Sequence, residues 1–73
     1  MQKTPVKLLD VVALLVDKPQ EELVTGQVGT VVEMLASGVF EVEFLDSKGR
    51  TVAVTELKRE EVLVLKHEAA VAA

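Results

Sequence analysis

Three glutamates are the residues of this sequence best suited to acid–base chemistry. Glu41 and Glu43 lie two positions apart in the segment Val39–Phe44, and Glu33 precedes them in another apolar segment. Alternate side chains of a strand point to the same face, so Glu41 and Glu43 share a face and Glu33 could lie across from them. Paired carboxylates act as general acid and base when they converge in a pocket. No nucleophile or orienting base accompanies them, so we interpret the set as a solvated outer face and predict no catalytic residue.

Two further features could bind a phosphate or a metal. Gly26-x-x-Gly29 has the glycine content of a phosphate-binding loop, but it lacks the Gly-Lys-Ser/Thr ending of a P-loop. We interpret it as the turn that opens a strand. His67 is the only histidine and the chain has no cysteine, which leaves too few ligands for a zinc site. The sequence therefore predicts no cofactor and no metal.

Four cations are the candidates for contact with nucleic acid. Lys48 and Arg50 flank Gly49 in a predicted hairpin tip, and Lys58-Arg59 follows in the next segment. A small basic patch would form if the two pairs came together. The net charge of -4 repels a phosphate backbone, and the chain has no Tyr or Trp for base stacking. The composition argues against a nucleic-acid partner, and a small-molecule substrate is not evident either.

The elements that position these residues are predicted to be strands. Half of the chain (49%) is apolar and rich in Val, which favours pleated, half-buried surfaces. Turn residues divide the chain after each apolar segment. The first segment is apolar on both alternating faces and suits a strand covered on both sides, or a short buried helix. The predicted strands are residues 9–16, 30–35, 39–45, 50–55 and 62–65.

The third predicted strand has the clearest alternation. Phe40, Val42 and Phe44 share one face and should point into the core with Val31 and part of 9–15. The residues 57–61 resemble one helical or 3₁₀ turn before the last strand. Together these elements predict an all-β fold, a small SH3-like five-stranded barrel with a 3₁₀ turn before the last strand. The predicted organisation is a flexible N-terminus (1–6), one barrel domain (7–65) and a flexible Ala-rich C-terminal tail (66–73).

Three segments carry a resemblance to a known family. They are residues 8–15, residues 23–33 with Gly26-x-x-Gly29-Thr30, and residues 39–44. The glycine-led strand and the following hairpin resemble the KOW and SH3-like barrel group. More narrowly, the chain resembles a small bacterial family catalogued as domain of unknown function 4926. That resemblance implies the fold and a bacterial cytoplasmic protein, and it brings no catalytic, cofactor or binding residue with it.

The apolar residues exceed what one inner face of a small barrel can hold. The surplus must lie singly on the surface or gather into a patch, and a contiguous patch indicates a partner. The segment between Asp10 and Asp17 contains no polar residue and is the expected centre of such a patch. The predicted partner-surface residues are Val11, Val12, Leu14, Val16, Val39 and Leu45.

The ends of the chain give weaker signals. No apolar leader segment follows Met1, and the longest apolar run is too short to cross a membrane. We therefore expect a cytoplasmic protein. The residues 68–73 resemble the small apolar C-termini that bacterial AAA+ proteases engage, although we favour the interpretation as an ordinary disordered terminus or a weak helix.

These observations support one function and leave one alternative. The first is a non-enzymatic protein-binding module or accessory subunit, with a protein partner or a second copy; an antitoxin- or immunity-like role would suit its size and charge. The alternative is a KOW-like RNA- or ribosome-contacting domain, which needs the cations to cluster. The biological process and the partner are not encoded in any motif.

Overall fold

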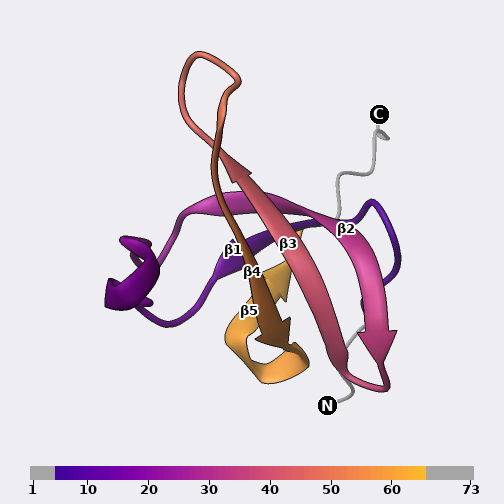
Figure 1. The fold of residues 1–73 in the computed structure, drawn as a ribbon. Helices are drawn as coiled ribbons and strands as arrows, with labels where there is room; N and C mark the ends of the chain where they lie inside the picture. Colours follow the sequence, from indigo (N-terminus) through magenta and orange to yellow (C-terminus); the bar gives the residue numbers. More distant parts are fainter. Residues whose placement is uncertain (1–4, 66–73) are drawn as a thin grey trace, which may run out of the picture.

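The computed structural model describes residues 5–65, and these form five antiparallel strands in one sheet. The strand order is β4-β3-β2-β1-β5, so the first strand lies between the second and the last. The sheet curls on itself, as Figure 1 shows. The prediction of an all-β fold with a 3₁₀ turn before the last strand is confirmed. The strands are β1 (Val11–Leu14), β2 (Val28–Ala36), β3 (Val39–Leu45), β4 (Thr51–Lys58) and β5 (Val62–Val64); the 3₁₀ turns are η1 (Pro19–Glu21) and η2 (Arg59–Glu61).

The core lies on the inner face of this curled sheet. Phe40, Val42 and Phe44 alternate with half-buried glutamates along β3, and all three are fully buried. The predicted register of this strand is therefore confirmed. Apolar residues from every other strand and from the loop after η1 complete the core, namely Val12, Leu14, Leu23, Val31, Leu57 and Val62. No polar or charged side chain of the described residues is buried.

Two β-bulges change the register between β2 and β3. Val31 pairs with Val42 and Glu33 pairs with Glu41, so Val32 is an extra residue in β2. A bulge bends its strand and shifts the alternation of the residues that follow. As a result Met34, which pairs with Phe40, lies on the inner side, and Glu33 lies on the outer side. Leu35 is the extra residue of the second bulge.

Gly29 allows β2 to approach β3 closely. It pairs with Phe44, and a Cβ atom at this position would lie 2.6 Å from Val42 Cγ1 and 2.8 Å from the carbonyl oxygen of Glu43. Only a residue without a side chain fits against the core here. The Gly26-x-x-Gly29 motif is thus a strand entrance, in which Gly29 has a packing role.

The first strand is shorter than the sequence predicts, and only one of its faces is buried. β1 spans Val11–Leu14 rather than residues 9–16. Val12 and Leu14 are in the core, whereas Val11 is exposed and Ala13 half-buried. The prediction of a strand covered on both sides is wrong, because nothing among the described residues packs on the outer side of the sheet.

The predicted termini lie mostly outside the described residues. Val6 packs against the core, while the rest of the predicted flexible N-terminus is described only at Pro5. The Ala-rich tail (66–73), with His67 and the suggested degradation signal, lies outside them entirely. Within residues 5–65, no helix is long and apolar enough to span a membrane.

Candidate functional site

Exposed aliphatic side chains gather on the outer face of the sheet across four strands. Ala13 of β1 pairs with Val28 of β2 on one side and with Leu63 of β5 on the other. The pairing of β2 with β3 ends at Gly29 and Phe44, and Val28 and Leu45 are the next residues beyond this pair on their strands. This gives one apolar row from β3 to β5.

A second row lies one step further along the same strands. The N–H of Leu65 donates to the carbonyl oxygen of Val11 at 2.9 Å, which places Leu65 beside Val11. On its other side Val11 pairs with Thr30. We call the six residues of the two rows the apolar patch: Val11, Ala13, Val28, Leu45, Leu63 and Leu65.

The apolar patch is contiguous and contains no charged residue. About half of the Val28 and Leu63 side chains is exposed (51% and 52%), although both lie in paired strands. Single exposed aliphatic residues are ordinary on a soluble protein, whereas contiguous groups of them are typical of interaction sites. The pairing of β1 with both β2 and β5 is what brings these residues together.

The outer face becomes acidic further along β2, β3 and β4, beyond the level at which Glu43 lies between Thr30 and the half-exposed Val54. Glu41 of β3 pairs with Glu33 of β2 on one side and with Glu56 of β4 on the other. We call these three residues the glutamate ladder. Glu43 lies between the ladder and the apolar patch, since it pairs with Thr30, and it accepts a hydrogen bond from the Thr51 hydroxyl.

Glu33 lies across from Glu41, as the sequence allowed, and Glu56, which was not among the predicted residues, extends the row; the three do not form a converging acid–base pocket. Glu33 and Glu56 are exposed and Glu41 is half-buried on an open face. No group of acidic or histidine side chains in residues 5–65 has the arrangement of a metal site. The geometry of the ladder suits contact with an external cation-bearing surface better than proton transfer within a closed site.

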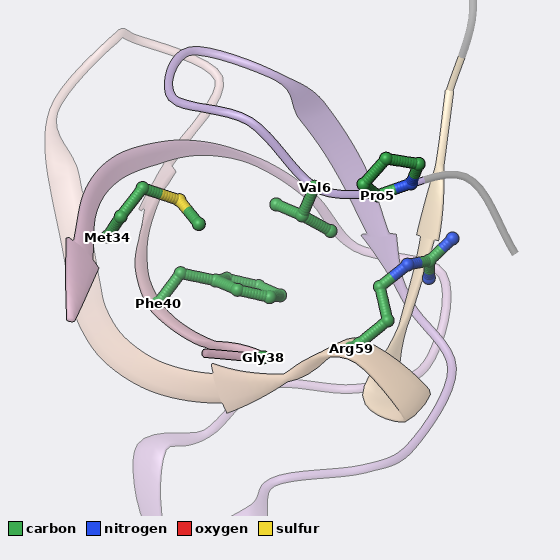
Figure 2. Close-up of a pocket in the computed structure, with 6 residues that line it drawn as sticks. All are labelled: Pro5, Val6, Met34, Gly38, Phe40 and Arg59. Carbon is green, nitrogen blue, oxygen red and sulfur yellow. The ribbon is translucent and has the colours of Figure 1, made fainter. Parts of the chain in front are cut away.

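A small pocket opens at the end of the sheet where β2 turns into β3. It has a volume of about 160 Å³ and is lined by Pro5, Val6, Met34, Gly38, Phe40 and Arg59. Figure 2 shows Met34, Val6 and the Phe40 ring facing one another, with Arg59 at one side. Arg59 donates from Nη1 to the carbonyl oxygen of Val62 at 2.9 Å. The lining holds no acid, base or nucleophile, and the volume suits one apolar side chain better than a cofactor.

The four predicted cations do not come together. Lys48 and Arg50 lie in the loop between β3 and β4, whereas Lys58 is the last residue of β4, at its opposite end, and Arg59 begins η2. Figure 1 shows this loop projecting from one end of the sheet and η2 at the other. Arg50 is also paired with Asp46, Nε to Oδ2, at 3.1 Å. The basic patch that an RNA contact needs is therefore absent from these residues.

The predicted partner-surface residues divide between the two faces. Val11 and Leu45 are exposed and belong to the apolar patch. Val12 and Leu14 are buried in the core, so their assignment to the surface is wrong; they alternate with Val11 and Ala13 and point inward. Val16 and Val39 are half-buried, and Val16 packs against the core. Sequence reasoning did not single out Val28, which joins the patch only through strand pairing.

Carboxylates also stabilise the loops on either side of this face. Glu61 of η2 accepts a hydrogen bond from Lys18 Nζ at 2.8 Å, which with the Lys58 N–H lowers its pKa despite partial burial. Hydrogen bonds from the N–H and the hydroxyl of Thr25 lower the pKa of Asp17. The pKa of Asp46 is lowered chiefly by the hydrogen bond from the Arg50 N–H. Glu61 thereby ties η2 to the loop after β1, next to β5 and the edge of the apolar patch.

The fold and the outer face define a small all-β domain with a candidate docking surface. A family model described as "Domain of unknown function (DUF4926)" matches residues 8–64. The chain belongs to this family, as its three sequence segments predicted. Neither a curated protein nor a solved structure matches the chain.

Proposed function

We propose that this chain is a non-enzymatic protein-binding module, or an accessory subunit, that docks on a protein partner through the apolar patch. The observation that carries the proposal is the continuity of the patch. One apolar row runs from β3 across β2 and β1 to β5, and Val11 with Leu65 widens it on the β1 and β5 side, with no charged residue among the six. Burial of apolar area stabilises a complex by roughly 25 cal/mol per Å² before the entropy of association is subtracted. An uncharged core surrounded by polar residues is also the usual anatomy of a protein interface.

The distribution of charge supports a protein partner over a nucleic acid. The glutamate ladder and Glu43 give the β3 side of the outer face a negative potential, which repels phosphates. The four cations lie at two separate ends of β4. This arrangement favours the protein-binding function over a KOW-like RNA contact. A bacterial, cytoplasmic setting, as the family resemblance implies, is part of the same proposal.

Capture from a lysate of the native host, followed by quantitative mass spectrometry, tests the proposal with a matched pair of variants. Val28→Lys places a charge at the centre of the apolar patch. Val24→Lys adds the same charge at a valine that is 58% exposed in the loop before β2, outside the patch. We expect a partner that is retained by the wild type and by Val24→Lys and lost with Val28→Lys. Equal retention by all three chains would contradict docking through the patch.

Light scattering at tens of micromolar distinguishes a second copy from a different protein. A homodimer that dissociates on Val28→Lys would make the partner another copy of the chain. An interface of about 1,000 Å² or more is expected for any specific complex.

A further inference from the structure

We infer that the partner presents lysine or arginine side chains beside an aliphatic contact, so that its cations meet the glutamate ladder while its aliphatic side chains cover the apolar patch. This inference rests on the proposed function and specifies the chemistry of the partner. It follows from the placement of two unlike surfaces on one side of the same strands.

The glutamate ladder is unfavourable for the isolated chain. Side chains directly opposite each other on neighbouring strands have Cβ atoms about 4.5–5.5 Å apart, and like charges there are destabilising. Glu41 has such a neighbour on both sides, Glu33 and Glu56. The ion pairs found between described residues join Lys18 to Glu61 and Arg50 to Asp46, and neither involves the ladder. A partner's cation would therefore remove repulsion as well as add attraction.

The ladder and the apolar patch are close enough for one partner to cover both. Thr30 pairs with Val11 of the patch on one side and with Glu43 on the other. Glu43 is two residues from Glu41 on the same face of β3, so carboxylates continue directly from the edge of the patch. Lysine and arginine have long stems that can lie along apolar surface while their charged ends reach a neighbouring carboxylate.

A second copy of the chain does not provide this chemistry. Each copy carries a net charge of -4, and its own outer face would bring glutamates toward the glutamates of the first. Charge complementarity therefore favours a different, basic and aliphatic protein surface, and it also predicts fast, salt-sensitive association.

Selection from a displayed library of random dodecapeptides on the immobilised chain tests this inference. Selected peptides are then synthesised, and their affinities are measured by fluorescence anisotropy at low and high salt. The ladder variant carries Glu33→Gln, Glu41→Gln and Glu56→Gln. Its matched control carries Glu21→Gln, Glu22→Gln and Glu60→Gln, three exposed glutamates outside the ladder, so both variants have the same net charge. The patch variant is Val28→Lys.

We expect the selected peptides to combine Lys or Arg with aliphatic residues. Their affinity should fall about tenfold with the ladder variant, be nearly unchanged with the control variant, and be lost with the patch variant. If the patch variant abolishes binding but the ladder variant matches its control, the inference is wrong and the proposed function stands. If the peptides bind the patch variant as well as the wild type, both are contradicted. If no peptide is selected, the inference is contradicted. A homodimer formed through the patch would also overturn the inference.

Discussion

The apolar residues on the inner and outer faces of the same strands differ in how far they are buried. Along β1 and β3, the inward residues Val12, Phe40, Val42 and Phe44 are fully buried. Their immediate outward neighbours include Val11 and Leu45, which are about half exposed although they are equally apolar. The inner set accounts for the fold, since it forms one continuous core. The outer set is about half exposed and packs on no other element among the described residues, and this contrast is the reason for proposing that it contacts a partner.

The largest expected difference in the free energy of unfolding is between variants of Phe44 and of its neighbour Leu45. Phe44→Ala removes a fully buried ring and leaves a cavity, which should lower the free energy of unfolding by about 3 kcal/mol or more. Leu45→Ala, on the half-exposed outer side, should change it by less than about 1 kcal/mol. Urea titrations followed by circular dichroism measure both. Similar losses for the two variants would break the distinction between the faces.

The second comparison is between Gly29 and Val28, which are also neighbours on opposite faces. Gly29→Ala places a methyl group 2.6 Å from Val42 Cγ1 and against the backbone of β3, so overpacking should lower the free energy of unfolding by about 1–3 kcal/mol. Val28→Thr keeps the shape and β-propensity of an exposed side chain and should have an effect within about 0.5 kcal/mol. Thermal unfolding of both proteins provides the measurement. An unchanged free energy of unfolding for Gly29→Ala would mean that β2 and β3 separate easily.

The sequence predicted the inner face much better than the outer one. The alternation of phenylalanine, valine and glutamate in 39–45 specifies which side of β3 is buried, because a one-residue slip would bury both glutamates. The segment around β1 has no such contrast, so Val11, Val12, Leu14 and Val16 were all predicted for the surface, and Val12 and Leu14 proved to be core. The bulge at Val32 had no sequence signal, although it decides that Met34 rather than Glu33 faces inward.

The apolar patch depends on contacts between strands distant in sequence. Val28, Ala13 and Leu63 come from three different segments, and only the strand order β2-β1-β5 makes them one row. An excess of apolar residues could be counted from the composition, which correctly raised the question of a patch. Its location required the pairing of β1 with β5, which no local pattern encodes.

The third prediction concerns the ion pair between Glu61 of η2 and Lys18 of the loop after β1. About a quarter of the Lys18 and Glu61 side chains is exposed, so the ion pair is partly screened, and Glu61→Gln should lower the free energy of unfolding at neutral pH by about 1 kcal/mol or less. Glu60→Gln, at the exposed neighbouring residue, is the control.

The pH dependence of this effect has a definite sign. The pKa of Glu61 is lowered in the folded chain, chiefly by the hydrogen bond from Lys18. The folded state therefore binds this proton less readily than the unfolded state. The stabilisation is fully present above the unfolded pKa of about 4.5 and is lost as the pH falls through the folded pKa. Urea titrations at pH 7 and pH 3 should show a smaller difference between wild type and Glu61→Gln at the lower pH. A difference as large at pH 3 as at pH 7 would mean that the carboxylate charge is not responsible.

The smallest expected effect concerns the glutamate ladder and has the opposite sign. Glu41→Gln removes the central charge of the ladder and with it the repulsion from both Glu33 and Glu56, so it should raise the free energy of unfolding by about 0.2–1 kcal/mol. Salt screens such interactions between exposed charges. Added sodium chloride should therefore stabilise the wild type more than the variant, and the two should converge at high salt. Urea titrations across a salt series measure this difference. Destabilisation by Glu41→Gln at low salt would show that a group within the chain already balances the ladder, and the outer face would then have no unfavourable charge for a partner to relieve.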